Sequence, residues 1–476
     1  MKKLFARRSE NSITEGVIWK QLLIFFFPII LGTFFQQLYN TVDAVIVGQF
    51  VGKEALAAVG GPTGVLINLF VGFFVGLSSG ATVIISQYYG AQNYEEVSRA
   101  SHTAIALSIT GGALIMVIGI IFAPWALAAI DTPADIIDDA VSYLRIYFIG
   151  MIPSLLYNMG SGILRAVGDS QRPLYFLIAG CLVNIVLDLV FVLFFHMGVD
   201  GAAIATIISQ FVSALLVMIA LVRTTEPYKI FIKQIRFHKD LFTNIIKIGL
   251  PAGLQSVMYG FSNIFVQASV NAFGTDTVAA WTAYGKIDAV FWMMIGAFGV
   301  SITTFVGQNF GAGKYDRVHK STGICLAMAA GSTIVLSTFL CLFGKYIYRI
   351  FTQDAIVIDR GIQILLFLVP FWITYVSIEI FSGAIRGTGD SVIPMIMTCF
   401  GVCILRIIWV HTGVPYFNTI ESVAASYPIT WILTSLLFII YYFRGRWLRR
   451  RRAFAGDPLT DGEKMHIFQS FLGRKV

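Results

Sequence analysis

Two carboxylates lie inside apolar segments, where charged side chains are rare. Asp188 lies in the second half of an apolar run from about residue 174 to 195, which is long enough to span a bilayer as a helix. Asp43 lies in the first apolar run of the chain. A carboxylate near the bilayer centre costs roughly 2.5–3.5 kcal/mol, so it is tolerated where it faces a protein interior or a wet cavity.

Two further polar residues accompany these carboxylates. Asn184 shares a helical face with Asp188 because the two are four residues apart, and Thr206 offers a hydroxyl in the next apolar segment. Together with Asp43, these side chains predict a site that binds a proton or a small cation such as Na⁺. The alternative is a set of polar groups that satisfy one another between helices.

Other polar residues inside apolar segments are Lys286, Asp288, Glu379 and Arg406 in the second half of the chain, with Gln37 and Asn40 in the first segment. An ion pair of Glu379 with Arg406 or Lys286 would hold helices together, because pairing is the cheapest way to keep charges in lipid. Contact with a substrate is the alternative interpretation, and the same applies to Gln37 and Asn40 as residues of a substrate cavity.

The elements that position these residues must be membrane helices. Of the 476 residues, 57% are hydrophobic and 13% are charged, whereas a soluble domain carries about 25% charged residues. Twelve apolar segments are expected to be helices, because an open sheet cannot satisfy its edges in lipid. Their approximate limits are 17–47, 55–88, 97–122, 136–162, 173–195, 201–223, 241–270, 277–309, 317–343, 356–384, 392–411 and 422–443. Pro28, Pro153, Pro251 and Pro370 fall inside these segments and can kink a helix.

Basic residues predict the orientation of these helices. Most of the 34 Lys and Arg residues fall on one side if the N-terminus, the even-numbered loops and the C-terminus share that side. We therefore expect a multi-pass protein of the cell (inner) membrane with both termini in the cytoplasm. The basic segments 224–240 and 444–476 suit anionic lipid headgroups, and the chain leaves no room for a folded nucleic-acid-binding module.

The two halves of the chain repeat each other. Arg165–Pro173 recurs as Arg386–Pro394 at an offset of 221 residues, and Gln87–Tyr94 recurs as Gln308–Tyr315 at the same offset. Two matches at one offset predict two six-helix lobes of the same orientation, related by an axis along the membrane normal. We expect a central cavity between them and alternating access by rocking of the lobes.

Other classes of function leave no sign in the sequence. The pattern of a phosphate-binding loop is absent, so transport would depend on an ion gradient or on a partner chain. The six histidines are scattered and no hydrolase motif occurs, so we expect no enzymatic activity. The five cysteines lie in apolar stretches without the spacing of zinc ligands. We expect no cofactor other than H⁺ or Na⁺ as a coupling ion, and no structural metal.

Several motifs resemble those of the multidrug and toxic compound extrusion (MATE) family of efflux transporters, bacterial type. They are Gln36–Asp43, Gln87–Ala91 with its repeat Gln308–Ala312, Gly162–Asp169, Ala384–Gly387 and Asn184–Asp188. The resemblance, which covers about residues 17 to 443, implies an all-α polytopic membrane protein. Its 12 transmembrane helices would form two pseudo-symmetric six-helix lobes around a central cavity. It also implies a secondary antiporter that exports organic cations or drugs in exchange for H⁺ or Na⁺.

The resemblance also implies roles for particular residues. In similar proteins a cation site of the N-lobe uses an Asp in the first span, an Asn and an Asp in the fifth, and a Thr in the sixth. These positions match Asp43, Asn184, Asp188 and Thr206. Some members use an acidic residue of the seventh span, which is absent here between residues 241 and 270, and Glu379 remains a candidate for a site in the C-lobe.

The expected domain order follows from the repeat and the resemblance. It comprises a cytoplasmic N-terminus (1–16), the N-lobe (17–223), a cytoplasmic linker (224–240), the C-lobe (241–443) and a basic cytoplasmic tail (444–476). We expect a monomer. No small-xxx-small face stands out above the general glycine content, so the sequence leaves the oligomeric state open. The alternative function is a flippase or exporter of lipid-linked or other anionic metabolites with the same architecture. A channel or scaffold without coupled transport is a further alternative.

Overall fold

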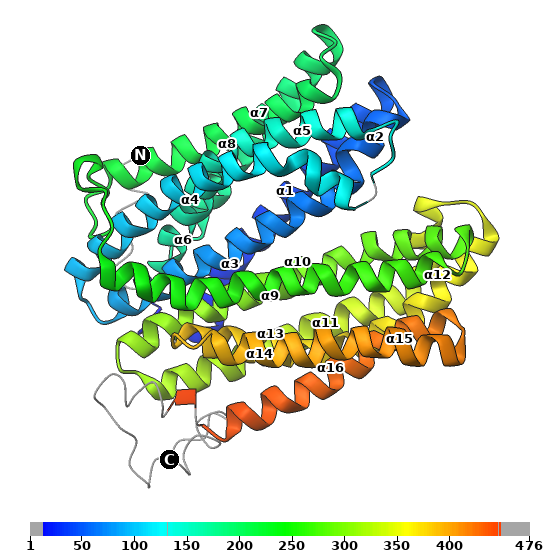
Figure 1. Cartoon of the computed structure of the whole chain (residues 1–476). Coiled ribbons are helices and arrows are strands. Elements are labelled where there is room, and N and C mark those ends of the chain that lie inside the picture. Colours follow the sequence, from blue (N-terminus) through cyan, green and yellow to red (C-terminus); the bar gives the residue numbers. More distant parts are fainter. Residues whose placement is uncertain (1–12, 131, 446, 449–476) are drawn as a thin grey trace. The chain divides into compact units, whose positions relative to one another are not determined.

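The computed structural model describes residues 13–130, 132–445 and 447–448, all of which lie in helices or in the turns and loops between them (Figure 1). This confirms the predicted all-α class. The basic residues Arg449–Arg452 of the predicted tail lie outside the described residues. In chain order the α-helices are α1 (Ile18–Phe50), α2 (Lys53–Gly60), α3 (Pro62–Gly90), α4 (Tyr94–Ala129), α5 (Ile137–Ile149), α6 (Met151–Ala166), α7 (Gln171–Asp188), α8 (Gly198–Arg223), α9 (Lys239–Asn271), α10 (Thr275–Gly311), α11 (Tyr315–Phe351), α12 (Ala355–Leu368), α13 (Trp372–Gly387), α14 (Val392–Thr398), α15 (Leu405–Phe417) and α16 (Ile420–Phe443).

The long helices account for all twelve predicted apolar segments. Among the described residues, ten helices or adjoining helix pairs are long and apolar enough to cross a membrane, and α5 with α6 gives an eleventh span that is bent by 49°. α9 has 33 residues but is less apolar, because it carries polar residues such as Gln255, Asn263 and Gln267. The protein is therefore a multi-pass membrane protein.

Two of the four prolines coincide with a break in a helix. α6 begins two residues before Pro153, directly after the bend at Gly150, and Pro370 lies in a short 3-10 stretch between α12 and α13. Pro28 and Pro251 lie inside the continuous helices α1 and α9. The sequence therefore located two of the breaks, but proline alone does not decide where a helix ends.

Two stretches of π-helix interrupt the regular helices. Leu189–Phe194 directly follows Asp188 at the end of α7, and Cys399–Ile404 ends two residues before Arg406. π-helical turns are rare and often occur at functional sites. Asp188 and Arg406, the charged residues beside these two stretches, are therefore candidate functional residues.

The chain forms two compact units, which we describe separately. The N-terminal unit comprises Ile24–Gly253, and the C-terminal unit comprises the described residues of Met1–Leu23 and Leu254–Val476. The division falls inside α1 and α9 rather than in the segment between α8 and α9. The first part of α9 thus belongs to the N-terminal unit.

The repeated sequence motifs form the same turn in both units. Gly168 and Gly389 have positive φ angles of 92° and 93°. The N–H of each donates to the carbonyl of the arginine three residues earlier, over 2.9 and 2.8 Å. Glycine adopts this left-handed conformation without strain, which explains why it occurs in both copies. Gln92 and Gly313, also 221 residues apart, share positive φ angles of 58° and 69° in the second motif.

Glycines bring α3 and the first part of α9 into backbone contact within the N-terminal unit. A Cβ atom added at Gly80 would lie 2.7 Å from the backbone nitrogen of Gly249, and one added at Gly76 would lie 2.5 Å from the Cα of Gly253. On each helix the two glycines are four residues apart, the small-xxx-small spacing of close helix pairs. This contact was not predicted from the sequence, because the same spacing is hard to single out among 44 glycines.

The segment between α8 and α9 is anchored to α4 through two histidines. Nε2 of His102 accepts a hydrogen bond from the N–H of Phe231 (3.0 Å), while Nδ1 of His102 lies 2.7 Å from the carbonyl oxygen of Ser98. Because a carbonyl oxygen only accepts, Nδ1 carries the proton and Nε2 is free to accept. The imidazole of His102 also stacks on the ring of Phe231.

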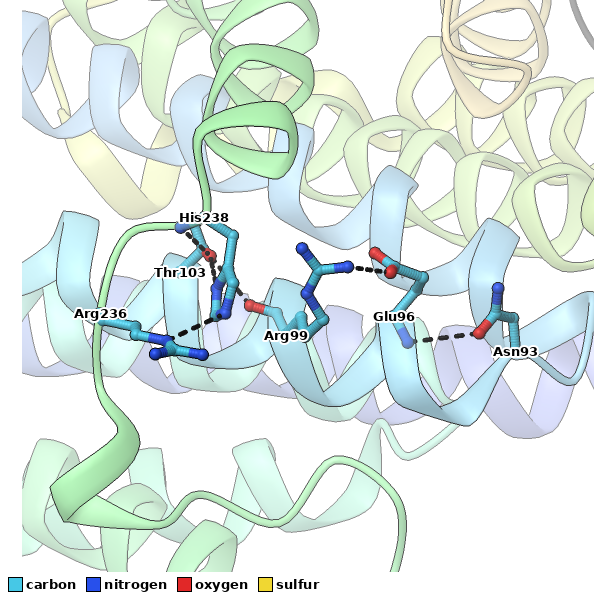
Figure 2. Close-up of polar contacts among 6 residues, drawn as sticks. All are labelled: Asn93, Glu96, Arg99, Thr103, Arg236 and His238. Carbon is cyan, nitrogen blue, oxygen red and sulfur yellow. Dashed lines mark hydrogen bonds and ion pairs between the residues drawn. The ribbon is translucent and has the colours of Figure 1, made fainter.

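The second anchor is His238, shown in Figure 2. Its N–H donates to the hydroxyl oxygen of Thr103 (3.3 Å), its Nδ1 lies 3.1 Å from the same oxygen, and its Nε2 accepts from Nε of Arg236 (3.3 Å). Burial lowers the pKa of His238, and the neighbouring charges of Arg99 and Arg236 lower it further. The neutral imidazole is therefore the form that fits this anchor.

Candidate functional site

Three helices of the N-terminal unit bring the four predicted cation-site residues together. α1 supplies Asp43, α7 supplies Asn184 and Asp188 four residues apart, and α8 supplies Thr206. The exposed fractions of Asp43, Asn184, Asp188 and Thr206 are 6%, 0%, 0% and 4%. All four polar side chains are thus held away from solvent.

The hydrogen bonds within this set leave most of its polar atoms unsatisfied. The hydroxyl of Thr206 lies 3.4 Å from Oδ2 of Asp43 and 3.0 Å from the carbonyl oxygen of Ala202, so its one hydrogen favours the carbonyl. Oδ1 of Asp43, both carboxyl oxygens of Asp188 and both amide atoms of Asn184 are buried without a hydrogen-bond partner among the described residues. Five buried polar atoms of this site therefore lack a donor or acceptor while both carboxyl groups are ionised. Asp43 and Asp188 lie close enough to hydrogen-bond each other once one of them carries a proton.

The charges of this site are also uncompensated. The carboxyl groups of Asp43 and Asp188 act on each other electrostatically, and in the described part of the chain no basic side chain forms an ion pair with either of them. Two adjacent carboxylates in a region of low dielectric repel each other strongly. Either one of them takes up a proton, or a cation binds between them and compensates both charges. Carboxylate, amide and hydroxyl oxygens are ligands that suit a hard cation. The arrangement can therefore hold a proton or a small cation.

Three neighbours of this site were missed in the sequence. Tyr143 of α5 is 4% exposed and lies within electrostatic reach of both carboxyl groups. One turn later, the hydroxyl oxygen of Tyr147 accepts a hydrogen bond from Nε2 of Gln210 on α8 over 3.5 Å. Oε1 of Gln210 is buried without a hydrogen-bond partner among the described residues. Their i, i+4 spacing is visible in the sequence, but aromatic residues are too frequent in apolar segments for it to stand out.

Gln37 and Asn40 lie on the exposed face of α1, where Nδ2 of Asn40 is 3.4 Å from Oε1 of Gln37. Neither side chain takes part in the hydrogen bonds of the buried set. Their assignment to a substrate cavity stays a prediction.

The ion pair expected for Glu379 is not formed. Among the described residues no ion pair joins it to Lys286 or Arg406. Lys286 is exposed on α10. The positive charge that acts on Glu379 is that of Arg386, which lies in the last turn of the same helix, α13. The carboxylate of Glu379 lies against Gly299, where any larger residue would collide with it. The reason for the error is geometric, since apolar segments do not show which helix faces meet.

The remaining charged candidates lie in the C-terminal unit. Oδ2 of Asp288 accepts a hydrogen bond from Nε1 of Trp292 over 2.5 Å. Arg406 is 2% exposed, and its guanidinium lies 3.3 Å from Oδ1 of Asn263. In the part of the chain that is described, no group of three or more His, Cys, Asp or Glu side chains could hold a metal ion.

Comparison with known proteins identifies the family. A model of the MatE family matches residues 28–190 and 251–410, one segment in each half of the chain. The chain belongs to the MatE family. It is thus a membrane efflux transporter of the MATE type, as its motifs predicted, and transporters of this type are not an enzyme class.

Curated relatives of this MATE protein cover nearly its whole length. The probable multidrug resistance protein YoeA of Bacillus subtilis (strain 168) is 26% identical over 447 residues, which cover 91% of this chain and 95% of the relative. The multidrug export protein MepA of Staphylococcus aureus is 21% identical over 441 residues, with the same two coverages of 91% and 95%.

Solved structures share the fold. A MATE crystal structure in a bent conformation has a TM-score of 0.85 at 22% identity and covers 93% of this chain and 98% of that one. A transporter of the MOP superfamily from Pyrococcus furiosus has a TM-score of 0.84 at 22% identity, with coverages of 93% and 97%. These structures support the MATE fold.

Proposed function

We propose that this MATE protein is a secondary antiporter that exports organic cations in exchange for H⁺ or Na⁺. In this proposal Asp43, Asn184, Asp188 and Thr206 bind the coupling ion. The observation that carries the proposal is the buried pair of Asp43 and Asp188, close enough to share a proton, beside an Asn184 amide without partners in the described part of the chain. Unsatisfied buried polar groups are rare in native proteins, and a proton or cation removes their cost. The names of the relatives, multidrug resistance and multidrug export proteins, favour drug-like substrates.

Coupling follows if the ion and the substrate act on the same conformational equilibrium. Because Asp43 and Asp188 lie on different helices, an ion between them draws α1 toward α7 and changes the packing of the N-terminal unit. If that change weakens substrate binding, then the substrate weakens ion binding by the same factor. The ion enters from outside, the lobes alternate, and the ion leaves to the cytoplasm, from which a cationic substrate then enters.

The test is transport of ethidium by the purified protein in liposomes, with a proton gradient and a sodium gradient imposed separately. We expect one gradient to drive transport in the wild type. Asp188→Asn keeps the shape of the side chain and removes its charge, so it should abolish driven transport without unfolding the protein. Asp138→Asn removes an exposed carboxylate of α5 and is the matched control, with transport expected at the wild-type rate. Unimpaired driven transport in Asp188→Asn would refute the proposed ion site.

The second candidate function is export or flipping of anionic metabolites, and Arg406 favours it. This buried guanidinium has no carboxylate partner among the described residues, so it is available to an anionic group. If neither gradient drives ethidium transport, export or flipping of anionic metabolites becomes the better-supported function. A lipid-linked or anionic substrate would then be assayed in the same liposomes.

A further inference from the structure

Arg406 is the most deeply buried basic side chain of the C-terminal unit that the structure describes, and its hydrogen bonds are weak. It lies on α15, 2% exposed. Nη1 lies 3.3 Å from Oδ1 of Asn263 on α9, and Nη2 lies 3.5 Å from Oγ1 of Thr430 on α16. Nε is buried without a partner. A guanidinium has five N–H donors, so most of its donor capacity is unused.

The charge of Arg406 is also only partly compensated. Its guanidinium carbon lies 4.0 Å from the ring centre of Tyr427, a cation–π contact. The charge of Arg406 acts on Asp288, which forms no ion pair with it and accepts a hydrogen bond from Trp292 through one carboxyl oxygen. The hydroxyl of Tyr284 also interacts with this carboxylate. A positive and a negative group thus act on each other here, and the guanidinium keeps free hydrogen-bonding capacity.

This region opens to the surface of the C-terminal unit. Asn263 is exposed, and Asp288 and Tyr427 are partly exposed, so side chains around the buried guanidinium reach the surface. Trp431 is 1% exposed and packs behind two partly exposed rings, those of Trp292 (ring distance 6.3 Å) and Tyr427 (5.3 Å). The accessible rings of Trp292 and Tyr427 therefore lie near one group of each charge.

We infer that Arg406 is the anion-binding residue of a substrate site in the C-terminal unit. A carboxylate of the substrate accepts two parallel hydrogen bonds from the guanidinium, as planar Arg–carboxylate pairs do. A cationic group of the same substrate faces Asp288, and its ring system lies against the partly exposed rings of Tyr427 and Trp292. The site thus takes aromatic zwitterions, which narrows the substrate class of the proposed exporter and rests on that function for calling them substrates.

The π-helical stretch Cys399–Ile404 supports this assignment independently of the hydrogen bonds. It changes the helical phase directly before Arg406 and so sets which way this side chain points. Regular helix throughout 392–417 would turn Arg406 to another face. A structural role alone would not require its donors to stay unpaired.

The experiment compares two rhodamine dyes that share one xanthene cation. One carries a free benzoate and is a zwitterion, and the other is its methyl ester, which is only a cation. Fluorescence anisotropy measures their binding to the purified full-length protein in detergent, without any gradient. We expect the wild type to bind the zwitterion at least about ten-fold more tightly than the ester, since the carboxylate forms charge-assisted hydrogen bonds.

Three variants test whether Arg406 causes the preference for the zwitterionic dye over its ester. Arg406→Gln should remove it, and Arg406→Lys should restore part of it, because lysine keeps the charge but not the planar fork. Asn263→Asp places a carboxylate beside Nη1 of Arg406 and should exclude the zwitterion while the ester still binds. Arg145→Gln, which changes an exposed arginine of α5, is the matched control and should keep the wild-type preference.

The outcomes separate this site from the antiport mechanism. If Arg406→Gln does not fold, Asn263→Asp still tests the site, because it leaves the guanidinium in place. Equal affinity of the wild type for both dyes, or an unchanged preference in Asn263→Asp, would overturn the proposal and assign Arg406 a purely structural role. A wild-type preference without gradient-driven ethidium transport would instead refute the antiport mechanism and leave this site standing.

Discussion

Replacing Gly80 by alanine tests whether α3 and α9 are held at backbone contact. The added Cβ would collide first with the backbone oxygen of Ile245, and it would lie 2.7 Å from the nitrogen and 2.9 Å from the Cα of Gly249. Ordinary contacts of a Cβ atom begin near 3.4 Å, so the two helices must move apart. The opposing atoms belong to the backbone, and no side chain can rotate away to make room.

The magnitude follows from two opposing effects. An extra methyl group in a tightly packed site costs about 1–3 kcal/mol, and the upper end applies where only backbone can move. Alanine is favoured over glycine inside a helix by about 1 kcal/mol. Gly80→Ala should therefore lower the free energy of unfolding by about 2 kcal/mol, the difference of these two effects.

Gly331 is the matched control, because it lies inside α11, is exposed, and a Cβ there would meet nothing within 4 Å. Gly331→Ala gains the same helix preference without a collision and should raise the free energy of unfolding by up to about 1 kcal/mol. The difference between the two variants, about 3 kcal/mol, then reports the collision alone. Unfolding curves of both purified proteins in dodecyl maltoside, titrated with SDS, give this difference. If both alanine variants have equal stability, the reasoning about the α3–α9 seam is wrong.

Three further predictions concern the ion site, a helix end and the α4 anchor. Asn184→Leu should raise the free energy of unfolding by about 1 kcal/mol in the SDS titration, because it removes two buried unsatisfied groups, yet abolish gradient-driven ethidium transport. Asp354→Ala should lower the stability by about 1 kcal/mol in the same titration, because the carboxylate caps α12 by accepting from the N–H of Ile356 (2.8 Å). Burial, together with the charges of Arg99 and Arg236, lowers the pKa of His238. Its anchor is therefore complete above the ordinary histidine pKa of about 6.5 and is lost as pH falls through the lowered pKa. Proteolysis of the segment between α8 and α9 should therefore accelerate at low pH in the wild type and be fast at every pH in His238→Ala.

The sequence was informative where a local pattern decides the structure. Hydropathy located the twelve long helices, since lipid leaves the backbone no alternative to a helix. The i, i+4 spacing of Asn184 and Asp188 correctly placed both on one buried face, and their selection as a cation site stays a prediction. The repeat identified turns whose glycines, Gly168 and Gly389, have nearly equal φ angles in the structure.

The sequence failed where contacts between distant helices decide the outcome. The partner of Glu379 depends on which face of α13 meets which helix, and hydropathy does not contain this information. Lys286, chosen as a partner, is exposed. The direction in which Arg406 points from α15 depends on the π-helical stretch Cys399–Ile404 before it, and no local sequence pattern predicted that stretch. Such features arise from tertiary packing, so they become visible only in the structure.

The repeat preserves the scaffold of the two halves but not their buried chemistry. At the offset of 221 residues that relates the turns, Arg406 corresponds to Ile185, and Asp188 corresponds to Trp409. At these positions the first half thus buries a carboxylate where the second half has an aromatic residue, and the second half buries a guanidinium where the first is aliphatic. Two copies of one scaffold with different buried charges suit different ligands. An ion site in one half and a site for an anionic substrate group in the other therefore require no difference in fold, only these exchanges of buried side chains.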